Sequence, residues 1–372
     1  MFTCSPPLKD KMLEIFHHLH HHPEVSWEEK ETTTFLKNVL EKEGCRVQTF
    51  THSTGLFAEL GSGNPVIAIR ADIDALWQEV DGTFQANHSC GHDAHMTIVL
   101  GMMYLLKEAI LPGTVRFIFQ PAEEKGTGAL RMVEEKVVDG VDYLFGVHLR
   151  PIQEVRDGYA SPCIIHGAGR FIEGEIIGED LHGARPHLGA NAIEVGASLV
   201  QMLQTLHIDP LVPSSVKLTK FHAGGESSNI IPGNASFSID MRAQTNEVMA
   251  QMQKKIEGLF KTVEDFYSIS IEYEIESDTP AAVENEQAQM IMAKAISTVL
   301  GEEKCIPPIT TTGGDDFHFY TIQRPSLKAT MLGLGCDLKP GLHHPYMTFN
   351  KEAMFKGSEI LAEAVMLAFE QK

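Results

Sequence analysis

Hydrophobic positions in the first part of the chain alternate between helical spacing and short unbroken apolar runs. The run VIAIRA is continuously apolar, which is typical of a strand buried on both faces of a parallel sheet. The run MTIVLGMMYLLKEA is long enough for a buried helix. The pattern predicts helices over residues 8–22, 28–43 and 96–109, and strands over 66–71, 114–120 and 143–148. This alternation predicts an α/β sheet.

A different order of elements begins near Phe171. It predicts a strand over 171–177, a helix over 191–206, strands over 215–222 and 235–243, a helix over 246–267 and a strand over 268–275. The order β-α-β-β-α-β is that of ferredoxin-like domains. Helices predicted over 287–300 and 351–370 then resume the earlier style. We therefore expect a catalytic α/β domain of residues 1–169 and 279–372, interrupted by a smaller inserted domain of residues 170–278.

Composition narrows the classes of partner. The formal net charge of −20 argues against nucleic acid or an anionic membrane as the main partner, because both would be repelled. No signal peptide or membrane span is expected, since no apolar run is long enough. The six cysteines are scattered without a disulfide framework, so we expect free thiols in a reducing cytoplasm. The stretch HHLHHHPE at 17–24 has helical spacing and is interpreted as a solvated or packed helix face.

Polar side chains gather where the predicted strands end. Asp72 and Asp74 follow the strand VIAIRA, PAEE follows the strand ending at Gln120, and His148 closes YLFGVH. In open α/β sheets, sites form beyond the carboxyl ends of the strands. The stretch HSCGHDAH adds further candidates just before the helix predicted over 96–109. These segments are therefore expected to meet at one edge of the sheet.

The residue types at this edge suit a borderline divalent cation such as Zn²⁺, Mn²⁺ or Co²⁺. A bound cation lowers the pKa of water from about 15.7 towards ~7, and a carboxylate that does not bind it can act as general base. Glu123 and Glu124 offer one carboxylate for each task, since neighbouring residues in an extended segment point in different directions. Taken singly, each motif has an ordinary structural explanation, such as a buried thiol for Cys90 or a core histidine for His148.

The motifs taken together resemble a known family. RADIDAL, CGHDAH, PAEE, GVHLRP, HGARPH, SSNIIPG, GGDDF and LHHP occur in the order found in metal-dependent N-acyl-amino-acid amidohydrolases. The chain is similar to the aminoacylase/carboxypeptidase family of dinuclear metallopeptidases, in its hippurate-hydrolase and auxin-conjugate-hydrolase branch. The similarity runs from LHHHPEVSWEE to the last predicted helix, nearly the whole chain.

The resemblance implies a centre of two divalent metal ions (Mn, Zn or Co) with a set of matched ligands. It implies Glu123 as general acid/base and Asp74 as an aspartate that orients the metal site. Asp72 stands where relatives outside this branch have a histidine ligand. The implied ligands are Cys90 as a bridging thiolate, His92, Glu124, His148 and His343, the last chosen over His344 because the family's ligand stands two residues before the proline.

The resemblance also assigns a role to the inserted domain, as a lid that mediates a homodimer. It implies that His182 stabilises the oxyanion, often from the partner subunit, and that Asn229 and Arg242 hold the substrate carboxylate. Arginine suits this task because its planar fork meets a carboxylate with two hydrogen bonds, although Arg242 could also be a solvated strand residue. The implied substrate is a small N-acyl amino acid or related amide.

The chain departs from the family pattern at several positions outside the ligand set. Trp77 stands where a proline is usual, His344 replaces a smaller residue, and Asp315 stands where glutamate is commoner. His17 and His18 replace a usual basic pair. The expected reaction is amide hydrolysis, in which Glu123 takes a proton from the attacking water and returns it to the departing amine. Two alternatives remain: a thiol hydrolase with Cys90 as nucleophile, and a non-catalytic metal- or ligand-binding relative.

Overall fold

A computed structural model describes residues 1–371, which divide into two compact units. The first unit comprises Met1–Ile165, Val283–Thr310 and the chain from Asp316 onward. The second comprises His166–Ala282 together with Thr311–Asp315. The second unit thus begins and ends a few residues outside the expected 170–278 and also takes in a short segment that follows it in the sequence.

The first unit is built on a seven-stranded sheet with the order β1-β2-β6-β3-β7-β17-β8. The inner strands β6, β3, β7 and β17 are parallel. At the edges, β2 and β8 run antiparallel to them, and β1 pairs antiparallel with β2. The strands span Arg46–Thr49 (β1), Leu56–Gly61 (β2), Val66–Asp72 (β3), Thr114–Gln120 (β6), Tyr143–Pro151 (β7), Ala160–Ser161 (β8) and Lys328–Leu338 (β17). The mixed α/β architecture expected from the sequence is confirmed.

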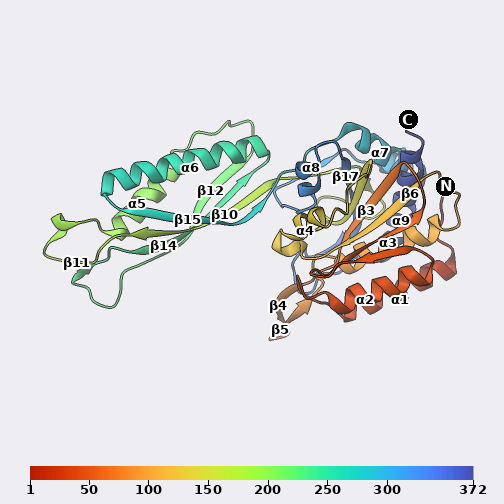
Figure 1. The fold of residues 1–372 in the computed structure, drawn as a ribbon, viewed down its shortest axis with the longest axis horizontal. Helices are drawn as coiled ribbons and strands as arrows, with labels where there is room; N and C mark the ends of the chain where they lie inside the picture. Colours follow the sequence, from red (N-terminus) through yellow and green to blue (C-terminus); the bar gives the residue numbers. More distant parts are fainter. Residues whose placement is uncertain (372) are drawn as a thin grey trace. The chain divides into compact units, whose positions relative to one another are not determined.

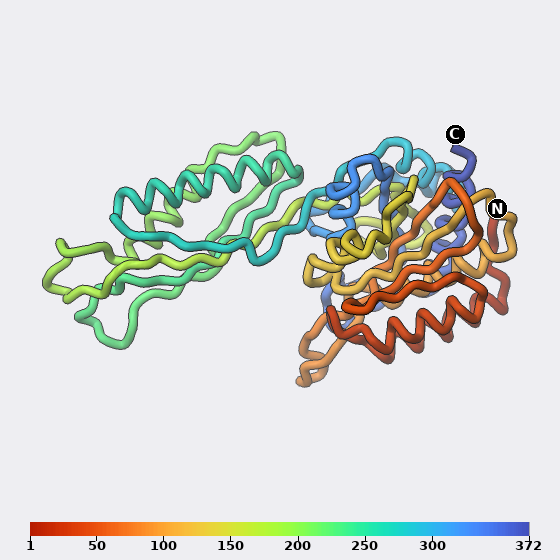
Figure 2. The backbone as a smooth tube through the Cα atoms, viewed as in Figure 1, coloured from red at the N-terminus to blue at the C-terminus, as the bar shows by residue number. Residues whose placement is uncertain are grey.

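Helices cover both faces of this sheet (Figure 1). One face packs against α1 (Pro6–His21), α2 (Lys30–Lys42), α3 (His92–Leu106), α7 (Glu286–Leu300) and α9 (Glu352–Phe369). The other packs against α4 (Gly128–Glu134) and α8 (His318–Gln323). Figure 2 shows the last part of the chain, in blue, returning beside the first, in red, where the backbone N–H of Cys4 donates to Glu359.

The apolar runs in the sequence explain why the sheet is covered by helices on both faces. All of β3 is buried, and its side chains alternate between the two cores: Ile67 and Ile69 enter one, and Ala68 the other. Helix α3 is apolar around its circumference and is buried along almost its whole length, as expected for a helix enclosed on all sides. Gly101 permits this, since a Cβ there would lie 2.4 Å from Oγ of Ser358 and 2.5 Å from Cε of Met12.

The second unit is an antiparallel four-stranded sheet with the order β12-β14-β10-β15, covered on one face by two helices (Figure 1). The elements span Ala168–Ile177 (β10), Ala192–Leu203 (α5), Ser214–Ala223 (β12), Ala235–Ala243 (β14), Asn246–Tyr267 (α6) and Ser270–Thr279 (β15). The first strand lies between the third and the fourth, which is the ferredoxin-like arrangement, so this expectation is confirmed.

Smaller elements complete the two units. A hairpin of β4 (Leu76–Val80) and β5 (Thr83–Asn87) follows β3, and β11 (Leu181–His182) pairs with β13 (Ile230–Ile231). The rest are β9 (Ile164–His166), β16 (Ile309–Thr311), and the 3₁₀ turns η1 (Glu123–Lys125), η2 (Pro186–Leu188) and η3 (Glu302–Lys304). Within residues 1–371, every helix is too short or too polar to cross a membrane.

Candidate metal centre

Five segments of the first unit bring polar side chains, among them the predicted ligands, to the carboxyl edge of its parallel strands. Asp72 ends β3, and the turn with Glu123 and Glu124 follows β6. His148 lies near the end of β7, and His343 follows β17. Cys90 and His92 come from the start of α3, which begins at His92 and so earlier than the predicted residue 96. In the sheet, β3 lies between β6 and β7, so strands that follow β3 in the sequence lie on both sides of it. In open α/β sheets, sites form at the carboxyl ends of the strands where the strand order reverses in this way.

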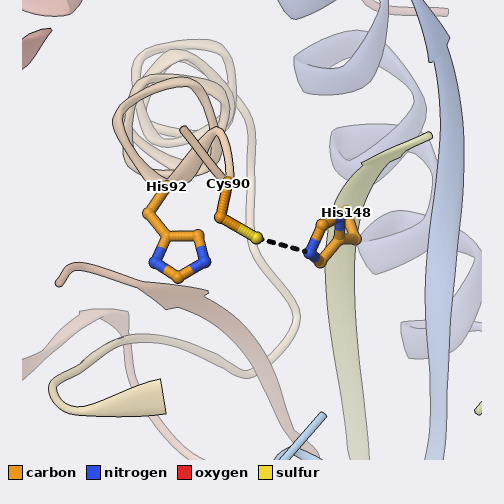
Figure 3. A group of neighbouring side chains, drawn as sticks. All are labelled: Cys90, His92 and His148. Atoms are coloured by element: carbon orange, nitrogen blue, oxygen red, sulfur yellow. Dashed lines mark hydrogen bonds between the residues drawn. The ribbon is translucent and has the colours of Figure 1, made fainter. Parts of the chain in front are cut away.

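A tight turn puts Cys90 and His92 on the same side of the helix start. Gly91 between them has φ 88°, a left-handed conformation that glycine adopts without a steric penalty. Figure 3 shows the Cys90 side chain directed at His148, whose Nε2 lies 3.6 Å from the sulfur, with the ring of His92 alongside. One ligand atom from each of these three residues lies within 4.8 Å of the others.

The ring of His92 is held by Asp74. Nδ1 of His92 lies 2.9 Å from the carbonyl oxygen of Asp74 and 3.2 Å from its Oδ1. The other carboxylate oxygen of Asp74 accepts from Ser26 Oγ at 2.6 Å and from the backbone N–H of Glu124 at 3.1 Å. One buried aspartate therefore fixes the ring and also positions the loop of the neighbouring glutamate, leaving Nε2 of His92 directed into the pocket.

Glu123 and Glu124 lie in the 3₁₀ turn η1 directly after β6. Ala122 before them has φ 51°, an uncommon conformation for a residue with a side chain, which turns the chain sharply at the strand end. Oε1 of Glu124 lies 3.8 Å from Nε2 of His92, and Oε2 of Glu123 lies 3.9 Å from the same nitrogen. Two carboxylates thus face one imidazole.

His343 completes the cluster from the loop after β17. Its Nε2 lies 3.5 Å from Oε1 of Glu124, and one ligand atom each from Cys90, Glu124 and His343 fall within 4.8 Å of one another. Its backbone has φ 64° and is held by a hydrogen bond from its N–H to the carbonyl of Ser89 at 2.7 Å. His344 instead accepts from the backbone N–H of Tyr346, so the geometry favours His343 as the ligand.

The pocket has the properties of a cation site. Nε2 of His92 and Oε1 of Glu124 are both buried and make no hydrogen bond within the described residues. Burial raises the pKa of Glu124 to about 7, and burial together with the charge of Glu124 raises the pKa of the Cys90 thiol well above its usual range. Buried acids of this kind become stable anions when a cation neutralises them, so the donor set fits a divalent metal.

The sulfur, imidazole and carboxylate donors indicate which metals the pocket suits. Nδ1 of His148 contacts the carbonyl oxygen of Leu149 at 2.7 Å, which leaves its Nε2 facing the sulfur of Cys90. This is the arrangement that metal-binding histidines adopt, with the second ring nitrogen held by the protein. Thiolate and imidazole ligands suit borderline ions rather than Ca²⁺ or Mg²⁺.

A buried network of hydrogen bonds lies next to the candidate ligands, and its members have no role predicted from the sequence. Asp72 accepts from Nη1 of Arg70 at 2.7 Å and contacts Nδ1 of His95 at 2.7 Å. The other ring nitrogen of His95 accepts from the backbone N–H of Leu149, next to His148. Arg70 also donates to Asp316 at 2.9 Å. Arg70 and Asp72 lie in the motif RADIDAL, and His95 lies in CGHDAH. These motifs were the only sign in the sequence that the three residues belong to the site, because their contacts depend on which strands pair.

The predicted oxyanion residue His182 and the two predicted substrate residues lie in the second unit. His182, on β11, pairs with Ile230 of β13, and the N–H of Gly183 donates to the carbonyl of Asn229 at 2.7 Å, so His182 and Asn229 are neighbours. Both are exposed. Arg242, on β14, donates to Asp240 at 2.7 Å and pairs across the sheet with Gly169 at the other end of β10.

Comparisons with known proteins place the chain in a family. The model of peptidase family M20/M25/M40 matches residues 68–367. The chain belongs to this family. An N-acetyl-L-cysteine deacetylase of Bacillus subtilis is 32% identical over 96% of this chain and 88% of its own length. An IAA-amino acid hydrolase (ILR1-like 2) of Arabidopsis thaliana is 29% identical over 100% of this chain and 88% of its own length.

A solved structure shares the whole fold. The YXEP protein of Bacillus subtilis, described as a dinuclear metal-binding peptidase of the M20 family, superposes with a TM-score of 0.84 at 27% identity. The match covers 98% of this chain and 99% of that one. The family resemblance seen in the motifs is confirmed, and so is the expected class, a dinuclear metal-dependent amidohydrolase.

Proposed function

We propose that this family member hydrolyses the amide bond of small N-acyl amino acids with two divalent ions held by Cys90, His92, Glu124, His148 and His343. The observation that carries the proposal is the pair of buried, unbonded atoms, Nε2 of His92 and Oε1 of Glu124, in a pocket of sulfur, imidazole and carboxylate donors. Manganese, zinc and cobalt fit this donor set. The relatives named for N-acetyl-cysteine and IAA-amino acids support N-acyl amino acids as the substrate class.

When bound, the cations would polarise the amide carbonyl and lower the pKa of water. Glu123 would act as the general base that takes the proton of the attacking water and then returns it to the departing amine. Its Oε2 faces the same imidazole nitrogen as Glu124, at 3.9 Å, which supports a place at the edge of the ligand set. Glu124, whose Oε1 also lies 3.5 Å from Nε2 of His343, would bind metal. The products are a carboxylic acid and a free amino acid.

The thiol-hydrolase alternative is less well supported. A nucleophilic cysteine needs a lowered pKa, whereas burial raises the pKa of Cys90. A thiol mechanism also gives no role to Glu124 and His343, although both face the same pocket. Cys90 is therefore proposed as a metal ligand that is deprotonated by the metal itself.

The second unit would supply groups that bind and stabilise the substrate. Arg242 lines a cavity of about 190 Å³ with Ser214, Ser215 and Gln244, and its guanidinium would hold the substrate carboxylate. Asn229 would assist it, and His182 would stabilise the oxyanion.

The spacing of these groups supports a homodimer. His182 lies on β11, shortly after Ile177, the last residue of β10. Arg242 pairs with Gly169, near the first residue of β10. The intervening strand is roughly 25 Å long at ~3.3 Å per residue, farther than a small N-acyl amino acid can reach. His182 would therefore act on the substrate of the partner subunit.

The six cysteines, all unpaired, support a reducing compartment, the cytoplasm.

A metal and substrate panel tests the proposal. The enzyme is dialysed against a chelator and reloaded with Mn²⁺, Zn²⁺ or Co²⁺, and hydrolysis of N-acetyl, benzoyl and indole-acetyl amino acids is followed by amine release. Loss of activity on chelation and recovery on reloading are expected. Activity that survives chelation but is destroyed by alkylation of the metal-loaded enzyme would favour the thiol hydrolase. A metal-loaded protein that turns over none of these amides would favour the non-catalytic alternative.

A further inference from the structure

His343 is the candidate ligand that the fold holds least firmly. It lies in the loop of residues 339–351 between β17 and α9. Its side chain is 55% exposed, whereas those of His92 and Glu124 are 1% and 10% exposed. Its backbone has φ 64°, a conformation that a residue with a side chain keeps only when its surroundings fix it. The loop therefore needs attachments that hold this ligand in place.

The hairpin of β4 and β5 supplies a stable surface for these attachments. It closes through Asp81 and Gly82, whose φ angles are 52° and 78°. Two positive φ angles and an Asp-Gly sequence are typical of the type I′ turn, which matches the natural twist of the two strands. The strand register places Gln78 and Asn87 on the same face of the hairpin. This face contacts the loop of His343.

Asn87 joins the hairpin to the loop. Its Nδ2 donates to Oε1 of Gln78 at 2.8 Å and to the carbonyl oxygen of Pro345 at 2.9 Å, which uses both N–H groups of the amide. Nε2 of Gln78 in turn donates to the carbonyl oxygen of His343 at 3.2 Å. Asn87 thus holds the loop directly and also orients the amide that contacts His343.

Other contacts attach the same loop to the same segment of chain. The hydroxyl of Tyr346 donates to Oδ1 of Asp81 at 2.8 Å, but both residues are exposed, where water competes for such a bond. The N–H of His343 donates to the carbonyl of Ser89, next to Cys90. Asn87 is half-buried, so among the side chains that contact the loop it is better shielded from water than Tyr346.

We propose that Asn87 is a positioning residue of the metal centre, which acts by holding the loop of His343. The inference rests on the proposed function, in which His343 binds metal. Ligand atoms of Cys90, Glu124 and His343 lie within 4.8 Å of one another. A second such group consists of Cys90, His92 and His148. Loss of the Asn87 amide should therefore weaken the binding of one ion and spare the other.

Competition with a chromophoric chelator tests this in the full-length enzyme loaded with Zn²⁺, because it measures the dissociation constants of both ions. In Asn87→Ala one ion should bind about 10-fold more weakly or worse, which is the usual effect of losing a residue that supports a ligand, and the other should bind as in the wild type. Gln85→Ala is the matched control. Gln85 is exposed on the same hairpin, where its amide donates to the carbonyl of Val80, and both ions should bind normally in this variant.

A double-mutant cycle with His343→Ala separates positioning from a general structural effect. His343→Ala should weaken the same ion as Asn87→Ala does. The double variant should bind that ion no more weakly than His343→Ala alone, because Asn87 acts through this histidine. Additive losses, or an equal weakening of both ions in Asn87→Ala, would overturn the proposal.

The cycle also distinguishes failure of this inference from failure of the proposed function. A loss in His343→Ala with none in Asn87→Ala would overturn the role of Asn87 and leave the ligand set intact. Normal binding in His343→Ala would overturn the ligand assignment and the role of Asn87 with it. Thermal unfolding checks that each variant is folded. Should Asn87→Ala fail to fold, Gln78→Met takes its place, since it keeps the length of the side chain and removes the amide that contacts His343.

Discussion

Nε2 of His92 lies 3.8 Å from Oε1 of Glu124, and both atoms are buried without a hydrogen-bond partner in the described chain. Buried polar atoms are almost always hydrogen-bonded, because leaving one unpaired costs about 1–3 kcal/mol. Two such atoms facing one another across a gap too long for a hydrogen bond are best explained by an ion between them.

Replacing Glu123 with Gln should abolish proton transfer while leaving the metals in place. The amide keeps the size of the side chain but cannot accept the proton of water, so kcat should fall by about 10²-fold or more. Metal analysis should give the same content as the wild type. Glu134→Gln, on the exposed surface of α4, serves as the control and should retain full activity. Near-normal kcat in the Glu123 variant would refute its role as the base.

Replacing Asp74 with Asn should weaken metal binding without removing a ligand. Asp74 holds Nδ1 of His92 and the backbone N–H of Glu124, and loss of such a supporting carboxylate typically costs 10–100-fold in metal affinity. Competition with a chromophoric chelator measures the change. Ser26→Ala removes only one hydrogen bond to Asp74 and should have a smaller effect. Unaltered affinity in Asp74→Asn would show that the aspartate does not orient the site.

Glu29 should make stability depend on pH. Its carboxylate is completely buried, where it accepts from Thr54 and from the backbone N–H of Ala122, and burial raises its pKa from 4.5 to about 7. The folded state therefore binds the proton more tightly than the unfolded state. The resulting stability is present below pH 4.5 and is lost as pH rises to about 7, a change of order 3 kcal/mol.

The variant Glu29→Gln should remove this dependence, because its amide carries no charge at any pH. Urea unfolding at a series of pH values should show the wild type losing stability relative to the variant between about pH 4.5 and 7. Glu28→Gln, at an exposed neighbouring position, is the control and should follow the wild type. Parallel pH profiles for the wild type and Glu29→Gln would contradict the prediction.

Mixing two inactive variants should restore activity if His182 serves the partner subunit. His182→Ala and Glu123→Gln are each expected to be nearly inactive as homodimers. In a hybrid dimer one site would carry both defects and the other neither, so random reassociation should recover about a quarter of wild-type activity. The hybrids are made by unfolding and refolding the mixture, with each variant refolded alone as control. No recovery, with both variants inactive when refolded alone, would place His182 in the site of its own subunit.

The second unit was the part of the fold best predicted from sequence. Strand β14 and helix α6 have the predicted bounds, because turn residues flank each of them and their apolar spacing is regular. Strand β17 was not predicted. Its sequence, KATMLGLGCDL, is interrupted by glycines, and it pairs in parallel with β7 far away in the sequence. Nothing local marks such a strand.

The candidate ligands could be predicted because each stands at a strand end or helix start, positions that hydrophobic runs locate well. The support residues could not. The contact of Asp72 with His95, and that of Arg70 with Asp316, depend on which strands are neighbours and on long-range packing.

The most direct test of the central claim is diffraction from metal-loaded crystals at the absorption edges of manganese and zinc. We predict two anomalous peaks per subunit, with the sulfur of Cys90 near both. Each peak should lie within bonding distance of members of the set Cys90, His92, Glu124, His148 and His343. Peaks bound by other residues, or an occupied enzyme in which these side chains touch no ion, would contradict it.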